Sequence, residues 1–88
     1  MKLICAVRDR AIDSFGTPIF VSARGEAMRS FVDTVTDPQS PFYKHPEDYD
    51  LYLLGAYDDA TGELIPEKPS MLMTAKEIRA IERDPPKS

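Results

Sequence analysis

The single cysteine Cys5 and the single histidine His45 could form a nucleophile and its base. A thiol beside an imidazole is a known catalytic pair. Cys5, however, lies in the middle of an apolar run over residues 3–7, where thiols are usually buried and unreactive. His45 lies between Lys44 and Pro46, where a solvated or capping role is more common than a catalytic one. We therefore predict that the protein is not an enzyme.

Two short acidic runs could in principle hold a metal ion. They consist of Glu47, Asp48 and Asp50, and of Asp58 and Asp59. Neither run has the alternating ligand spacing and central glycine of a calcium loop, and a second histidine for zinc is missing. The four glycines are isolated and form no phosphate-binding loop. The sequence thus predicts no metal and no cofactor.

Aromatic and basic residues are the remaining candidates, because single-stranded nucleic acid is bound by stacking bases on aromatic rings beside a cationic groove. The aromatic residues in or beside predicted loops are Phe15, Phe42, Tyr43, Tyr49 and Tyr52. If DNA is bound, we expect contacts from Arg8, Arg10, Arg24, Arg29 and Lys44, with Phe42 or Tyr43 stacking on a base. The alternative is that the aromatic rings fill a small core, as most do.

Charge limits where such a surface can lie. The net charge is −4, and residues 1–46 carry six basic and five acidic residues, whereas residues 47–88 carry five basic and ten acidic ones. A broad basic footprint, the usual sign of non-specific nucleic-acid binding, is absent. Any nucleic-acid surface is therefore expected to be local and in the first half of the chain.

The pattern of apolar residues predicts an α+β fold, with 88 residues forming one domain over residues 1–84 and a frayed tail at 85–88. We expect a small antiparallel sheet in the order ββαββ, one amphipathic helix packed on a face of the sheet, and a weak C-terminal helix. The expected strands cover residues 2–8, 18–21, 51–57 and 63–65, with 71–73 as a short further strand, and a hairpin turn at 58–62 joins two of them. Residues 37–50, with three prolines, are expected to form a long connection without secondary structure.

The central helix, predicted over residues 23–36, positions most of the expected core. Its apolar stripe consists of Ala27, Met28, Phe31, Val32 and Val35, with Phe31 in the middle as the anchor. Ser22 is a candidate N-cap, and Asp37-Pro38 ends the helix. Thr74 and Glu77 form a capping box that begins the C-terminal helix.

The first strand is apolar on both of its faces, which indicates a central strand or an edge strand completed by a partner. With so small a core, we expect a homo-oligomer. No apolar run approaches the ~18 residues of a membrane span, and the N-terminal run is too short for a signal peptide. A single cysteine fits a reducing cytoplasm, and we expect no membrane partner.

Residues 37–62, DPQSPFYKHPEDYDLYLLGAYDDATG, resemble the small nonstructural protein of gokushoviruses, which are single-stranded-DNA microviruses of bacteria. The strand MKLICAVRD, the segment Phe15-Gly16-Thr17-Pro18 and the spacing of Phe31, Asp33 and Val35 extend the similarity over roughly residues 1–66. The resemblance implies a DNA-binding protein that acts in viral single-stranded DNA synthesis or genome packaging in the cytoplasm of the bacterial host. It defines no site residues.

Two hypotheses follow. In the first, the chain is a phage nonstructural protein that binds single-stranded DNA, as an oligomer that pools its basic surface. In the second, it is an assembly factor that contacts capsid or replication proteins and binds no DNA.

Overall fold

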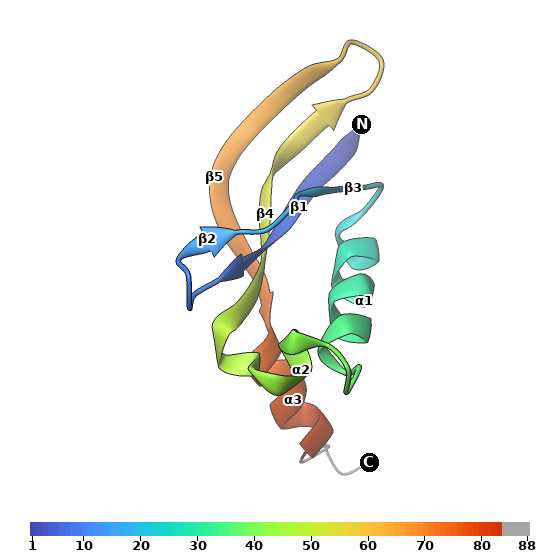
Figure 1. Cartoon of the computed structure of the whole chain (residues 1–88). Coiled ribbons are helices and arrows are strands. Elements are labelled where there is room, and N and C mark those ends of the chain that lie inside the picture. The colour runs from blue at the N-terminus through green and yellow to red at the C-terminus, as the bar shows by residue number, and fades with distance from the viewer. Residues whose placement is uncertain (84–88) are drawn as a thin grey trace.

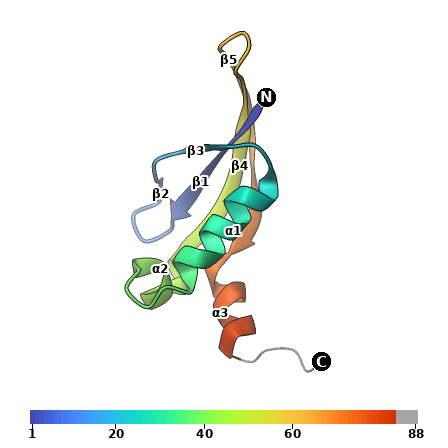
Figure 2. The same ribbon diagram turned by 90° about the vertical axis from the view of Figure 1, so that its right-hand side faces the viewer.

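The computed structural model describes residues 1–83, and the predicted tail at 85–88 lies outside these residues. The elements in chain order are β1 (Lys2–Asp9), β2 (Ser14–Phe15), β3 (Ile19–Val21), α1 (Arg24–Val35), α2 (Pro41–Lys44), the short 3-10 helix η1 (Pro46–Asp48), β4 (Tyr49–Asp58), β5 (Glu63–Thr74) and α3 (Ala75–Arg83). The strands form one antiparallel sheet and α1 lies across it, so the predicted α+β class is confirmed (Figures 1 and 2).

Strand β1 is an inner strand of the sheet. It pairs with β4 along one side and with both β2 and β3 along the other, in the order β2-β1-β4-β5. Apolar side chains lie on both faces of β1 because it is a central strand. This is the first of the two explanations predicted from the sequence. A partner chain is not needed to complete it.

The core lies between the sheet and α1. Phe31 (3% exposed) and Val35 (fully buried) pack from α1 against Cys5, Leu51 and Leu53 of the sheet. Helix α3 adds Ala75 and Ile78 to the same cluster. The predicted role of Phe31 as a core residue is confirmed.

Helix α1 begins one residue later than predicted, and Ser22 is not its N-cap. The N-cap is Ala23, whose side chain makes no capping bond. The Oγ of Ser22 instead accepts a hydrogen bond from Lys2 Nζ (3.2 Å), and the Ser22 N–H donates to Glu26 Oε2 (2.9 Å). The side chain of Ser22 is thus bound to the sheet and its backbone N–H to α1, and Glu26 accepts from the residue before the N-cap rather than from the N-cap N–H of a capping box.

The prediction that residues 37–50 lack secondary structure is wrong. Ser40 caps the single turn of α2, where its Oγ accepts from the N–H groups of Phe42 (3.0 Å) and Tyr43 (3.3 Å). Pro41 occupies the first helical position, where its missing N–H costs nothing. Segment η1 follows, and β4 already begins at Tyr49.

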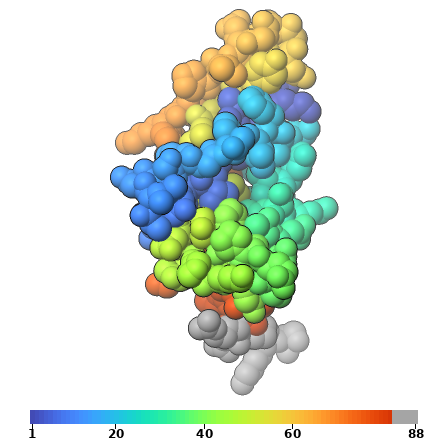
Figure 3. All heavy atoms as spheres, viewed as in Figure 1, coloured from blue at the N-terminus to red at the C-terminus, as the bar shows by residue number. Residues whose placement is uncertain are grey.

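The two short strands predicted at 63–65 and 71–73 are parts of one strand, β5. Gly55 opposes Pro66 and Leu53 opposes Ser70, so a bulge at residues 67–69 joins them. Strand β5 is an edge strand, where prolines such as Pro66 are tolerated. The β4–β5 hairpin extends beyond the rest of the sheet at one end of the molecule (Figures 1 and 3).

The capping box of α3 forms as predicted: the Thr74 N–H donates to Glu77 Oε1 (2.8 Å), and the Glu77 N–H donates to Thr74 Oγ1 (3.1 Å). Within residues 1–83, no helix is long and apolar enough to cross a membrane.

Candidate nucleic-acid interface

Helix α1 covers one face of the sheet, and the opposite face, here called the open face, has no helix of residues 1–83 packed on it (Figure 1). Residues that oppose each other in a sheet point to the same side. Phe20 opposes Ile4, Tyr52 opposes Ala6, and Phe15 opposes Arg8, so their side chains share the open face. The open face carries Lys2, Ile4, Ala6, Arg8, Phe15, Phe20, Tyr52, Tyr57, Leu64 and Met71.

Four aromatic rings form two pairs on the open face. Phe15 and Tyr52 meet edge to face with 5.4 Å between ring centroids, and Phe20 and Tyr57 meet in the same way, also at 5.4 Å. Phe15 is 40% and Phe20 51% exposed, although both are large apolar residues. Exposed rings on a sheet can stack on nucleic-acid bases.

The spacing of the two pairs follows from the register. Tyr52 opposes Ala6, and Tyr57 opposes Lys2, four residues away along β1. At ~3.3 Å per residue, the pairs lie about 13 Å apart along the strand. The open face is thus long enough for more than one base.

Cations flank the aromatic pairs. Arg8 forms an ion pair with Asp13, and this contact, with a smaller contribution from Tyr52, raises the pKa of Arg8. Lys2 lies at the other end and is bound to Ser22. Asp50, buried opposite Arg8, accepts a hydrogen bond from Arg10 Nε (2.7 Å), which balances its charge.

The structure does not gather the seven predicted DNA-binding residues on one surface. Arg8 lies on the open face and Arg10 beside it, whereas Arg24 and Arg29 are exposed on α1, on the other side of the sheet. Lys44 is exposed at the end of α2.

The two aromatic residues predicted to stack on bases both contact other side chains of the protein. Phe42 is half-buried, with its ring centroid 4.3 Å from that of Tyr49 and 5.8 Å from that of Phe31. Tyr43 lies under the guanidinium of Arg79, 3.8 Å from its ring centroid. Both rings therefore contribute to packing around α2.

Sequence reasoning missed Phe20 and Tyr57 as candidate site residues. Each lies in a strand that was predicted, but which rings share a face depends on the pairing register. Cys5 opposes Leu53, whereas Ile4 opposes Gly55, so Leu54 forms a bulge. Beyond this bulge, the side chains of β4 that point to a given face of the sheet change from even-numbered to odd-numbered residues or the reverse. Alternation along the predicted strand would place Tyr57 on the wrong face.

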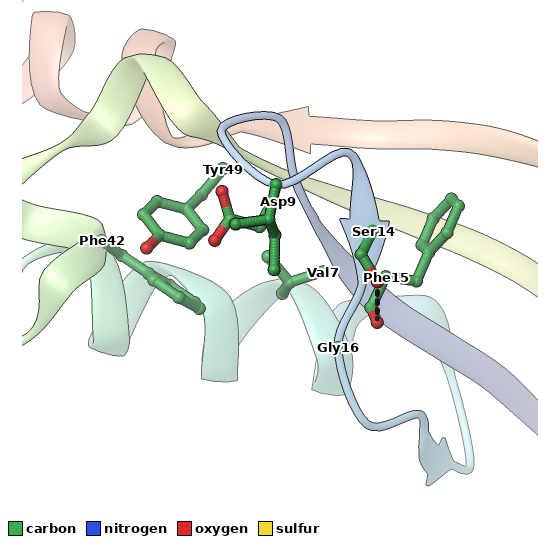
Figure 4. A pocket seen from close by; sticks show the side chains of 8 residues that line it. Val7, Asp9, Ser14, Phe15, Gly16, Phe42 and Tyr49 are labelled. Atoms are coloured by element: carbon green, nitrogen blue, oxygen red, sulfur yellow. Dashed lines mark hydrogen bonds between the residues drawn. The ribbon is translucent and has the colours of Figure 1, made fainter.

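A second feature is a cleft of about 190 Å³ between the β1–β2 turn and α2. It is lined by Val7, Asp9, Ile12, Ser14, Phe15, Gly16, Phe42 and Tyr49. Figure 4 shows the side chains of Asp9, Phe42 and Tyr49 at one end of the cleft, whereas the ring of Phe15 points away from them. The cleft and the open face thus meet at β2.

The catalytic and metal-binding candidates of the sequence receive little support. Cys5 is fully buried, and desolvation raises the pKa of its thiol although Arg24 partly opposes this shift. His45, Glu47 and Asp48 bring ligand atoms within 4.8 Å of one another on the surface. Exposed acidic groups often gather in this way without an ion, and we assign no metal to them.

A comparison with known families identifies the chain as a phage protein. The model of the family described as Phage ORF5 protein matches residues 2–78, and the chain belongs to this family. No curated protein and no solved structure matches the chain.

Proposed function

We propose that this phage protein binds single-stranded DNA through the open face of its sheet. The observation that carries the proposal is the row of two aromatic pairs between Lys2 and Arg8, each with one exposed ring, Phe15 or Phe20. Base stacking on aromatic side chains adds about 1–3 kcal/mol per base to the attraction between cationic side chains and phosphates. This mode suits a chain with a net charge of −4 better than binding by charge alone.

The biological setting of this activity is also a proposal. The similarity to gokushovirus nonstructural proteins supports a role in synthesis or packaging of a single-stranded DNA genome in the bacterial cytoplasm. Membership of a phage family is consistent with that setting.

The test is fluorescence anisotropy with a labelled single-stranded oligonucleotide, measured over a salt series. We expect weak binding whose log–log slope against salt is about −0.7 for each phosphate neutralised. The double variant Phe15→Ala/Phe20→Ala should weaken binding about tenfold or more, because two stacking surfaces are lost. Ile81→Ala is the matched control, since Ile81 is 59% exposed on α3.

The variant Arg24→Gln/Arg29→Gln distinguishes the open face from the surface of α1. It should bind DNA like the parent if the open face is the site. A loss of affinity in this variant, with normal binding by the phenylalanine variant, would move the site to α1. If the parent does not bind at low salt, DNA binding is refuted.

The second candidate function is an assembly factor that contacts a capsid or replication protein without binding DNA. The observation in its favour is charge, since ten of the fifteen acidic residues lie in residues 47–88. Such a surface attracts basic partners and repels phosphate. Absence of DNA binding together with binding to a viral protein would support this function.

A further inference from the structure

We infer that the cleft between the β1–β2 turn and α2 binds a basic side chain, preferably arginine, presented by a partner protein. The cleft adjoins the open face at Phe15, but its carboxylate and its other walls lie outside that face, and the inference does not depend on DNA binding. It rests on the shape, walls and charge of the cleft.

The walls are apolar and aromatic. Phe42 and Tyr49 lie with ring centroids 4.3 Å apart and their planes inclined by 31°, while Val7 and Ile12 line the cleft with them (Figure 4). A cation gains energy over the face of such rings. The chain already uses this contact elsewhere, where the Arg79 guanidinium lies over Tyr43.

The polar group of the cleft is the carboxylate of Asp9. Its Oδ1 accepts the N–H of Ala11 (2.9 Å), and within residues 1–83 no protein donor is bound to Oδ2. None of the eight lining residues is basic. The nearest arginines in sequence are used elsewhere, Arg8 by Asp13 and Arg10 by Asp50.

The surroundings of the cleft add negative charge. Burial raises the pKa of Tyr49, and the nearby carboxylates of Asp9 and Asp48 raise it further. A carboxylate with an open oxygen beside aromatic rings complements a guanidinium, which can donate to the carboxylate while its flat surface lies on a ring. A phosphate or another acid would be repelled.

The size of the cleft limits the ligand to a small group. Its volume of about 190 Å³ is below the ~300–1,000 Å³ of sites for drug-sized ligands. One side chain fits this space, whereas a folded ligand or a whole nucleotide does not. The partner is therefore expected to offer an exposed arginine on a basic segment.

The experiment is an NMR titration of the ¹⁵N-labelled protein with N-acetyl-arginine amide, compared with the citrulline analogue, which has the same shape without the charge. We expect saturable shifts at Asp9, Ser14, Gly16 and Tyr49 with arginine, and binding at least about tenfold weaker with citrulline. This comparison uses the unaltered protein, so it does not depend on a variant that folds.

Asp9→Asn should abolish the arginine shifts. Asp33→Asn removes the same charge from the exposed side of α1 and should leave them unchanged. Equal binding of arginine and citrulline, or no saturable shift at these residues, would overturn the inference. So would shifts in the cleft with deoxycytidine monophosphate but not with arginine, which would identify a nucleotide site.

Discussion

Phe31 and Phe20 are the same residue type in opposite environments. Phe31 is 3% exposed under α1, whereas Phe20 is 51% exposed on the open face. Truncation of a buried phenylalanine removes its burial energy and leaves a cavity. We expect Phe31→Ala to reduce the free energy of unfolding by about 3–5 kcal/mol, measured by urea denaturation.

Phe20→Ala is the control for this measurement. It should cost much less, because its ring is half in solvent before the change. A Phe31→Ala protein with the stability of the parent would mean that the α1 stripe is not the core. Equal losses in the two variants would contradict the assignment of the open face.

Tyr49 makes stability depend on pH in the alkaline range. Burial, followed by the charges of Asp9 and Asp48, raises the pKa of Tyr49 above its ordinary value of 10.0. The unfolded chain then loses this proton before the folded one. The contribution of Tyr49 is fully present below about pH 10 and is lost as the pH rises through the folded-state value.

The melting temperature of the parent should therefore fall more steeply above pH 10 than that of Tyr49→Phe, which has no phenol at this position. Both proteins should behave alike between pH 7 and 9, where the phenol is protonated in both states. Identical melting profiles up to pH 11.5 would show that Tyr49 titrates normally.

Among the elements, the close approach of the paired strands β4 and β5 depends on Gly55. A Cβ at this position would lie 2.4 Å from the carbonyl oxygen of Ile65, a backbone atom that cannot move without disturbing the bulge. Gly55→Ala should therefore destabilise the hairpin and lower the melting temperature. Hydrogen exchange of the β5 amides is the direct measurement.

Gly25→Ala is the matched control, because nothing lies within 4 Å of a Cβ added there. Alanine is the better helix former, so this variant should be at least as stable as the parent. If Gly55→Ala is equally harmless, the close approach of the two strands is not required.

Local signals in the sequence predicted the elements well and their pairing poorly. The stripe of α1, the hairpin turn at 58–62 and the Thr74–Glu77 capping box depend on neighbours within a few residues, and all three are present. Helix α2 was missed although Ser40 followed by Pro41 is a cap followed by a first-turn proline. This signal is present in the sequence, but the three prolines of residues 37–50 favoured the prediction of a connection without secondary structure.

The candidate site was harder to predict, because it is created by long-range pairing. The exposed rings of Phe15 and Phe20 come from β2 and β3, which pair with different halves of β1. The cleft likewise joins Asp9 to Phe42, which are far apart in sequence. The residue types indicated that bases stack on aromatic side chains, but they did not indicate which rings would be exposed.

At the scale of the whole molecule, the two faces of the sheet have different roles. One face holds the core under α1, and the other leaves apolar and aromatic side chains in solvent. Large exposed apolar surfaces usually mark interaction sites. The open face is the candidate for DNA and the cleft for a basic partner, so the two proposed activities can be removed separately by substitution.

The open face also gives a new reason to expect self-association. The apolar nature of β1 no longer supports it, because β1 is paired on both sides within one chain. Phe20, Leu64 (64% exposed) and Met71 (47% exposed), however, form an apolar surface that a second copy could cover.

We expect multi-angle light scattering to give a mass above 9.9 kDa that rises with concentration in the micromolar range. Phe20→Glu should return the protein to the monomer mass, because association would bury a charge, whereas Ile81→Glu, on α3, should not. A single 9.9 kDa species at all concentrations would exclude self-association and leave the open face available to DNA alone.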